Sequence, residues 1–293
     1  MASKKADNGE IVEDTTTAVV PNSDAGALAP YASTISADAL DIIRENMGPG
    51  ASFDMLSLPR VRIPTGGSTS WQQPTVDGVK NTDTITGVIA HMTPVKGYWA
   101  TSFEREPNQP PSCSSRDGIV GFGYRGPIDD AIDVTTLPDG ADARYDANGN
   151  LQSAHLCETC PLNAFGTKAN ADGSRGQGKA CKDMRALFVV EEGNVIPSVV
   201  MLSPMSIKPQ GDYFLALAGV ARRFWQVETA LTLTRATNRA GIAYARAAFA
   251  RSRNLEPSEI ERMASYRTLL LPAVEAAFEP VTPDDRDIVD TEA

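Results

Sequence analysis

The sequence predicts an α+β fold: a small β-barrel in the middle of the chain, a cysteine-bearing segment inserted in it, and helices behind it. The first observation is a series of runs between residues 53 and 234 in which apolar and polar residues alternate, as they do in strands. The second is a break in this series at residues 112–182, which have little regular pattern and contain every cysteine. The third is an alanine-rich segment after residue 236 with a helical pattern.

The two ends of the chain differ in composition from its middle. Residues 1–50 contain clusters of threonine, proline and glycine around one short helical pattern at 36–46, so we expect a flexible N-terminal arm. Residues 279–293 carry six acidic side chains, one arginine and two prolines, which predicts a disordered acidic tail. Residues 51–235 should then form the barrel. Residues 236–278 should form a helical segment, with helices at about 238–252 and from Pro257 onward.

Six runs are expected to be strands, and six strands suffice for a small barrel. They lie at residues 53–63, 84–92, 97–103, 185–190, 195–202 and 227–234. Thr93 and Pro94 separate the second run from the third, and Glu192-Gly193-Asn194 is typical of a turn between the fourth and the fifth. Residues 112–182, called the excursion below, are therefore one enlarged loop, and a loop of this length normally has a function or forms a subdomain.

All four cysteines of the chain, Cys113, Cys157, Cys160 and Cys181, fall in the excursion. Four thiolates complete a tetrahedral shell, and the two residues between Cys157 and Cys160 allow both sulfurs to face one ion, as in structural zinc sites. Glycines and a proline flank the sulfur-bearing turns, so these loops can wrap around an ion. We expect one structural zinc ion, which would supply the stability that the sparse apolar content of the excursion does not.

The sequence leaves other chemistry open for these cysteines. Two disulfides, a redox pair or an iron–sulfur cluster would use the same residues, and His155 is a further candidate ligand. Disulfides are disfavoured because the first residues lack the apolar core of a signal peptide, which predicts a reducing, cytoplasmic location. No run is long and apolar enough for a membrane helix, so we expect no membrane partner.

The net charge of −10 conceals a basic segment. Residues 151–253 hold 13 Lys or Arg against 7 Asp or Glu, and residues 222–253 hold seven arginines against Glu228 alone. Aromatic side chains lie among these arginines, and aromatic rings between cations suit stacked bases and a phosphate backbone. A solvated basic surface with the aromatic residues in the core is also compatible with this pattern.

The sequence contains no catalytic constellation. It has two histidines and lacks a nucleophile elbow, a Walker loop and a zinc-protease motif. The glycines at 121, 123 and 126 have dinucleotide-type spacing, but Pro127 and acidic residues follow instead of a helix, so we interpret them as turn residues. We therefore expect that the protein is not an enzyme.

Together, the four cysteines, the basic aromatic segment at 208–253 and the tail at 279–293 resemble phage-encoded single-stranded-DNA-binding proteins of the helix-destabilising kind. That class joins an OB-like barrel to an acidic C-terminal tail, and some members carry a zinc ion inserted in the barrel. The motif around Cys157, Cys160 and Cys181 also resembles a group of phage proteins without an established activity. The resemblance implies an OB-like barrel with a four-cysteine zinc insertion, binding of single-stranded DNA, and recruitment of replication or recombination proteins by the tail.

Such a protein needs a groove in which aromatic rings stack on bases and cations follow the phosphates. The residues expected to form it are Trp71, Tyr98, Trp99, Phe103, Lys179, Lys182, Arg185, Lys208, Arg222, Arg223 and Trp225. Because side chains alternate along a strand, one of Tyr98 and Trp99 should face outward and the other inward. Two other functions fit the sequence: a structural or virion-associated interaction protein in which zinc holds a loop, and an iron–sulfur enzyme or nuclease.

Overall fold

The computed structural model describes residues 45–46, 58–64, 67–100, 111–123, 154–169, 174–194, 196–238, 241 and 243–269. Its strands are β1 Arg60–Val61, β2 Trp71–Thr75, β3 Gly78–Thr82, β4 Thr84–Tyr98, β5 Cys113–Ser115, β6 Val120–Gly123, β7 Ala154–Leu156, β8 Lys182–Val190, β9 Ser198–Leu202, β10 Val227–Thr237 and β11 Ala243–Asn254. Its helices are α2 Pro204–Gly219 and α3 Pro257–Leu269, with short 3-10 helices η5 Pro161–Asn163 and η6 Phe224–Gln226. Within these ranges, no helix is both long enough and apolar enough to cross a membrane.

Two of the expected segments fall largely outside this description. Of the N-terminal arm at 1–50, only Glu45 and Asn46 are described, and both are helical. The whole acidic tail at 279–293 lies outside the described residues, as does the expected helical segment beyond Leu269.

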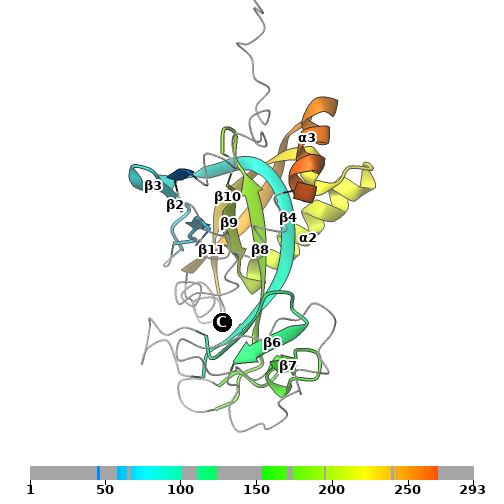
Figure 1. Ribbon diagram of the computed structural model, residues 1–293. Helices are drawn as coiled ribbons and strands as arrows, with labels where there is room; N and C mark the ends of the chain where they lie inside the picture. Colours follow the sequence, from blue (N-terminus) through cyan, green and yellow to red (C-terminus); the bar gives the residue numbers. More distant parts are fainter. Residues whose placement is uncertain are drawn as a thin grey trace, which may run out of the picture.

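Six strands form a curled, mixed sheet, which confirms the α+β class. β1 pairs in parallel with β9, and antiparallel pairs lead from β9 through β8 to β4. β10 pairs with the first residues of β4 and carries β11 on its other edge. Figure 1 shows β4 arching through the molecule, which gives the sheet its curl. Among the described strands, β1 and β11 each pair on one edge only, so the sheet is open and no closed barrel forms.

β4 is one continuous strand of 15 residues, which corrects the expectation of two strands on either side of Pro94. It pairs with β10 near its start, with β8 along its middle and with β5 at its end. Among the described strands, β8 alone pairs with β4 at Pro94, so the other edge of β4 needs no backbone donor there. The strand thus joins the excursion directly to the main sheet.

The main sheet is covered on both faces, and β8 runs through its interior. Residues 186–190 of β8 are all buried, as in a strand that packs on two sides. On one face, the core includes Trp225 of η6 and Tyr266 of α3. On the other face, it includes Trp71 and side chains of β10 and β11, and α2 packs over β11, β8 and β9. Figure 1 shows both long helices on the same side of the drawing, beside β4 and away from the β2–β3 hairpin.

β11 corrects the expectation of a helix at 238–252. Its alanine-rich sequence favours a helix locally, yet it pairs with β10 along its whole length. Buried Ala245 and Ala247 alternate with exposed Arg246, a period of two that is hard to recognise among small alanines. Pairing with β10 and packing against α2 outweigh the helix propensity of alanine. Helix resumes at Pro257, as predicted.

Two elements have no counterpart in the sequence prediction. The helix α2 begins after Ser203 with Pro204 in its first turn, which is a common helix start. Leu215 and Val220 are exposed on it or directly after it, so its amphipathic pattern is weak. The second element is the hairpin β2–β3, which turns through Val76 and Asp77 between the paired residues Thr75 and Gly78.

The excursion contains three short strands rather than bare loop. β5 pairs with the end of β4, and β6 and β7 extend the sheet from there. Val120, Phe122 and Ala154 form a small core of its own. Gly121 and Gly123 lie within β6, which corrects their interpretation as turn residues. Figure 1 shows this extension at the end of the molecule opposite to β2 and β3.

Candidate functional site

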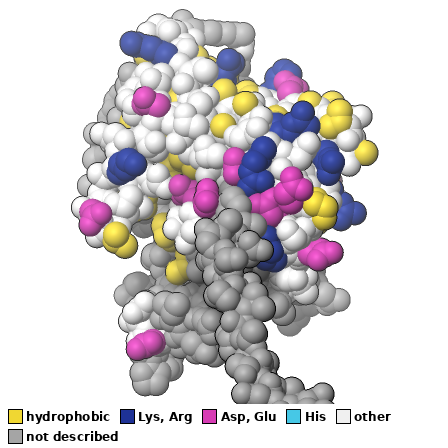
Figure 2. Space-filling model, turned by 90° about the horizontal axis from the view of Figure 1, so that it is seen from above, with side chains coloured by type: hydrophobic (Ala, Val, Ile, Leu, Met, Phe, Trp, Pro, Cys, Tyr) yellow, Lys and Arg dark blue, Asp and Glu magenta, His cyan; other side chains and the backbone are white. Residues whose placement is uncertain are grey.

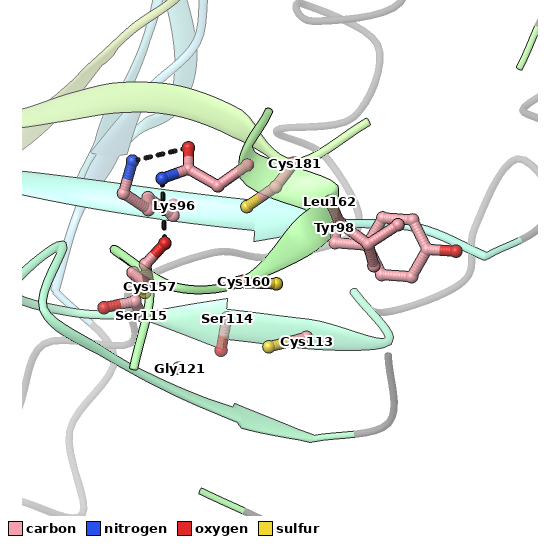
Figure 3. A pocket seen from close by; sticks show the side chains of 11 residues that line it. Lys96, Tyr98, Cys113, Ser114, Ser115, Gly121, Cys157, Cys160, Leu162 and Cys181 are labelled. Carbon is pink, nitrogen blue, oxygen red and sulfur yellow. Dashed lines mark hydrogen bonds between the residues drawn. The ribbon is translucent and has the colours of Figure 1, made fainter. Parts of the chain in front are cut away.

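The four cysteines, which come from three separate places in the chain, line one cavity. Cys113 is the first residue of β5, Cys157 follows β7, Cys160 precedes η5 and Cys181 precedes β8. The cavity has a volume of about 20 Å³, enough for one water-sized sphere. Figure 3 shows the labelled cysteines around this space, with Tyr98 at its rim. The structure therefore brings together the four residues that the sequence singled out as metal ligands.

Backbone hydrogen bonds hold the cysteine-bearing turns against one another. The amide of Cys157 donates to the carbonyl of Ile119 over 2.7 Å, which fastens the turn to β6. The amide of Cys181 donates to the carbonyl of Leu162 over 2.9 Å, which joins the start of β8 to η5. The amide of Asn163 donates to the carbonyl of Cys160 over 2.9 Å and closes the turn after Cys160. These bonds fix the backbone on which all the sulfurs except that of Cys113 are mounted.

Gly121 of β6 provides the space in which two of the sulfurs lie. A Cβ atom at this position would be 3.0 Å from the Sγ of Cys113 and 3.6 Å from the Sγ of Cys157. The first of these distances is too short for an unstrained contact, so a side chain here would push the Cys113 sulfur aside. The glycine is therefore required by the cavity and not by backbone conformation.

The thiols of Cys157 and Cys181 are stabilised in their neutral form. Burial is the largest cause and raises the pKa of both thiols above its ordinary value. A hydrogen bond with Ser115 and the positive charge of Lys96 oppose this rise at Cys157, and the other cysteines reinforce it at Cys181. A bound cation reverses this balance, since coordination removes the thiol proton.

In this structure the four sulfurs form no disulfide and are not gathered closely enough to bind one metal ion. All four cysteines are described, and none forms a disulfide. Within the described residues, no three His, Cys, Asp or Glu side chains are gathered closely enough to hold a metal ion. The backbone thus converges on one cavity, while the sulfurs do not form a liganding group in this arrangement.

A charged network lies beside the cavity and ties its walls to the main sheet. Asp183 of β8 accepts hydrogen bonds from Lys96 of β4 and, over 2.8 Å, from Lys179. Burial opposes ionisation of Asp183, but these lysines outweigh it and hold its pKa below the ordinary value. Asn163 accepts from both lysines, over 3.3 and 3.2 Å, and donates to the carbonyl of Cys157 over 2.8 Å. The dashed lines in Figure 3 mark the links from Lys96 to Asn163 and from Asn163 to Cys157.

The aromatic residues expected in a nucleic-acid groove do not form one surface. Trp71 is completely buried and donates from Nε1 to the carbonyl of Leu231 over 3.1 Å. Trp225 is also buried, and Trp99 packs against the same core. Tyr98 lines the cysteine cavity, so Tyr98 and Trp99 do lie in different surroundings, as expected for neighbours on a strand. Phe103 lies outside the described residues.

Three of the expected basic residues are engaged in or near the core. Lys179 is held by Asp183 and Asn163, and its ammonium lies 5.2 Å from the ring centre of Phe165. Arg185 donates to Gln210 of α2, which is completely buried. Lys182, at the start of β8, is partly buried. Of these three residues, Lys179 is ion-paired with Asp183 and Arg185 is bound to a neutral side chain.

The other basic residues lie at the surface. Lys208 is exposed and pairs with Asp212 one turn later in α2, over 2.7 Å. Arg222 is partly buried by its position after α2, and the guanidinium of Arg223 lies 5.7 Å from the ring centre of Trp225. Figure 2 shows Lys and Arg side chains interspersed with Asp and Glu on one side of the face seen from above. That face is mixed in charge rather than uniformly basic.

Sequence reasoning missed three features of this region. Lys96 lines the cavity, but nothing in the sequence connects this residue of β4 with the cysteines. Gly121 stands out in the sequence as a glycine among strand-like residues. Its role, which is to leave space for two cysteine sulfurs, is visible only in the folded sheet. Phe165 is 79% exposed, an unusual position for a large apolar ring, and it follows the cysteine pair closely in sequence.

Comparison with known proteins gives no relative from which a function could be transferred. No model of a known family, no curated protein and no solved structure matches this chain.

Proposed function

We propose that this protein binds single-stranded DNA without sequence preference, in DNA replication or recombination, and that one zinc ion stabilises it. Cys113, Cys157, Cys160 and Cys181 hold the zinc, which performs no chemistry. The acidic tail at 279–293 recruits replication or recombination proteins. Electrostatic attraction and base stacking provide the affinity, and no catalytic step is involved.

The observation that carries the DNA-binding proposal is that much of the arginine surplus of residues 222–253 stays at the surface after folding. Arg235, Arg246 and Arg251 on the β10–β11 ribbon lie at its surface. Arg253 is the exception, since it pairs with Glu228 and Glu259 and connects β11 to α3. Arg253 thus shares its charge between two carboxylates, whereas the charges of Arg235, Arg246 and Arg251 stay exposed. Arginines on an exposed strand ribbon are suited to phosphates.

The zinc proposal is supported by the convergence of four distant cysteines on one small cavity. A zinc ion binds thiolate sulfurs at about 2.3 Å. The sulfurs would have to move closer together to bind one ion, because no three of the described candidate ligands are gathered closely enough in this arrangement. Lys96 and Lys179 lie beside the cavity and offset part of the negative charge that four thiolates carry.

The OB-like character of the sheet is part of the same proposal. It is supported by a curled set of mainly antiparallel strands and by an excursion inserted between β4 and β8. Both faces of this sheet are covered by core side chains. In our proposal DNA therefore runs over strand edges and loops, and not across an open sheet face.

One observation favours a second function, that of an interaction protein in which the metal holds the excursion. Met205, Leu215 and Val220 are exposed apolar residues on α2 or directly after it. Exposed apolar side chains on one helix suit a protein partner. An iron–sulfur protein is the third possibility, because four cysteines can also hold a cluster.

A titration with fluorescent oligo-dT at several salt concentrations tests the leading proposal. We expect binding whose affinity falls as salt rises, with a slope of about −0.7 in log K against log [salt] for each phosphate neutralised. The triple variant R235Q/R246Q/R251Q should show a shallower slope. Absence of binding to oligo-dT at low salt would reject DNA binding and favour the interaction protein.

Elemental analysis of the same sample tests the metal. We expect one zinc per chain, a colourless solution, and loss of the zinc in the variant C157S/C160S. A brown protein that contains iron would contradict zinc and support a cluster. Removal of zinc with a chelator should lower the melting temperature, because binding free energy of a structural metal is also folding free energy.

A further inference from the structure

Beside the cysteine cavity, two short segments of the excursion, residues 165–169 and 174–179, run antiparallel to each other. We call this pair of segments the tongue. Phe165 faces Lys179 and Ala169 faces Arg175 in isolated bridges. The amide of Lys168 donates to the carbonyl of Gly178 over 3.0 Å, and that of Gly176 donates to the carbonyl of Lys168 over 2.7 Å. The tongue is therefore an ordered ribbon and not a bare loop.

The base of the tongue is fixed to the cavity walls. The hydroxyl of Thr167 donates to the carbonyl of Ala164 over 2.7 Å and accepts from the amide of Ala180 over 3.0 Å. Ala180 directly precedes Cys181, whose amide donates a hydrogen bond to the carbonyl of Leu162. The same stretches of backbone thus form the wall of the cysteine cavity and the base of the tongue. A metal ion that fixes the cavity would therefore also fix the tongue.

Phe165 is the exposed aromatic ring of this ribbon. It is 79% exposed, although burying such a ring elsewhere would contribute about 2 kcal/mol. Lys179 lies 5.2 Å from its ring centre and is itself anchored by Asp183 and Asn163, so the cation is held in place. An aromatic ring with a fixed cation beside it is a stacking platform for a base whose phosphates are close by.

The charged side chains in the described part of the tongue are all basic. The described residues 159–169 and 174–182 include Lys168, Arg175, Lys179 and Lys182, and they include no Asp or Glu. Lys168 is partly buried, and Arg175 lies in the strand opposite to it. In the sequence, Glu158 precedes this stretch and Asp172 lies between its two parts, outside the described residues. Asp183 of β8 pairs with Lys96 and Lys179. A purely apolar protein partner would have to cover these charges, whereas a nucleic-acid strand would pair with them.

We propose that the tongue contacts single-stranded DNA together with the arginines of β10 and β11, with Phe165 stacking on a base and Lys168 and Arg175 contacting the adjacent phosphates. This inference rests on the proposed function and gives it a location that shares only Lys179 with the residues that the sequence suggested. It also gives the metal a purpose, because the cavity at the base of the tongue sets the position of Phe165.

The test compares zinc-loaded variants of the full chain in the oligo-dT titration. F165A should lower the affinity about 5- to 150-fold, since loss of a base–aromatic stack costs about 1–3 kcal/mol. Its salt slope should not change, because no charge is removed. K168Q/R175Q should instead make the slope shallower by about 1.4, which is two phosphate contacts. F165W should keep the affinity and show additional tryptophan quenching when oligo-dT binds.

L215A is the matched control, because Leu215 is 73% exposed but lies on α2. It should bind oligo-dT like the wild type. Zinc content and melting temperature, measured for each variant, show that folding is retained. If the wild type binds oligo-dT and F165A binds equally well, or L215A loses as much as F165A, the tongue is not the contact. If the wild type itself does not bind, the proposed function fails, and this inference fails with it.

Discussion

Ala221, which follows the last turn of α2, has a left-handed backbone conformation. Its φ of 53° is the only positive value among the described non-glycine residues. The amide of Arg222 donates to the carbonyl of Leu217 over 2.9 Å, and that of Ala221 to Ala218 over 2.9 Å. This is the pattern of a Schellman cap, in which glycine usually occupies the left-handed position. Alanine there costs about 1–2 kcal/mol.

We therefore predict that A221G stabilises the protein by about 0.5–1 kcal/mol. Relief of the left-handed strain exceeds the entropy that glycine adds to the unfolded chain, which is about 0.4–1 kcal/mol. Urea unfolding measures the difference. A218G is the control, because the same replacement within α2 should destabilise the protein by about 0.5–1 kcal/mol. A loss of stability in A221G would show that the cap is not strained.

Gly121 gives a second prediction at the scale of one residue. G121A places a methyl group 3.0 Å from the Sγ of Cys113, so this sulfur cannot keep its position. We expect zinc affinity to fall about tenfold or more, as it does when the surroundings of a metal ligand are disturbed. Competition with a chromophoric chelator measures the affinity.

G211A provides the comparison for this variant. Gly211 lies inside α2, and a Cβ atom added there would meet nothing within 4 Å, so alanine fits. This variant should leave zinc affinity unchanged and stabilise the helix by up to about 1 kcal/mol. Equal zinc affinity in G121A and G211A would mean that the sulfurs do not bind the metal through this cavity.

At the scale of elements, an ion pair joins β11 to the start of α3. Arg253 donates to both carboxylate oxygens of Glu259, over 2.7 and 2.9 Å, and Glu259 is buried. Glu259 also accepts from the amide of Glu256 over 2.8 Å and so caps the helix. The hydrogen bonds from Arg253 are the largest cause that lowers the pKa of Glu259 below its ordinary value of 4.5.

A depressed carboxylate pKa predicts a dependence of stability on pH. The contribution of Glu259 is fully present above about pH 4.5, its value in the unfolded chain, and is lost as the pH falls through the lower value in the folded protein. E259Q should lower the free energy of unfolding at pH 7 by about 2 kcal/mol. Its stability should also fall less steeply than that of the wild type when the solution is acidified.

R253K is the companion variant, since lysine keeps the charge but cannot donate two parallel hydrogen bonds to the carboxylate of Glu259. It should lie between the wild type and E259Q in stability at pH 7. Denaturant unfolding between pH 3 and pH 7 would test all three proteins. If the stability of the wild type and of E259Q falls equally steeply with decreasing pH, the pairing with Arg253 does not lower the pKa of Glu259.

The elements also show where sequence patterns are informative. β8 and β9 were predictable, because β-branched and aromatic residues fill them and Gly193, with a φ of 80°, marks the turn between them. β11 was not predictable, because alanine favours a helix and only the partner strand β10 decides its conformation. α2 was not predictable either, because its exposed leucine and the exposed valine that follows it obscure the amphipathic pattern of a helix.

For the candidate site, the convergence of the cysteines was predictable from their number and spacing. The groove was not, because burial depends on the whole fold. Trp71 and Trp225 look like stacking residues in the sequence and are core residues in the structure. Phe165 looks like a loop residue and is the exposed one, a distinction that no local pattern carries.

At the scale of the whole molecule, the net charge of −10 opposes binding of another polyanion. Six of the acidic residues are concentrated at 279–293. Because it carries the same sign of charge as DNA, we expect this segment to compete with DNA for the basic surface. We predict that a chain ending at residue 279 binds oligo-dT more tightly at low salt and with a steeper salt slope, because fewer negative charges remain near the surface.

A full-length chain in which the acids of 279–293 are changed to Asn and Gln separates charge from length. It should behave like the truncated chain in the anisotropy titration. Unchanged affinity and unchanged salt slope in both proteins would rule out competition by the tail. Tighter binding in the truncated chain alone would assign the effect to the bulk of the segment instead of its charge.

The unbroken course of β4 determines how the two ends of the molecule move. Its 15 residues have a contour length of about 50 Å and reach from the β10 pairing to the cysteine cavity. Because β4 is paired along this length and the base of the tongue is fixed to the cavity walls, we expect the tongue and the main sheet to reorient in solution as one body. A spin label on the tongue would report the slow tumbling of the entire protein. Any strand of DNA held there is thereby presented at a constant angle to the arginines of β10 and β11.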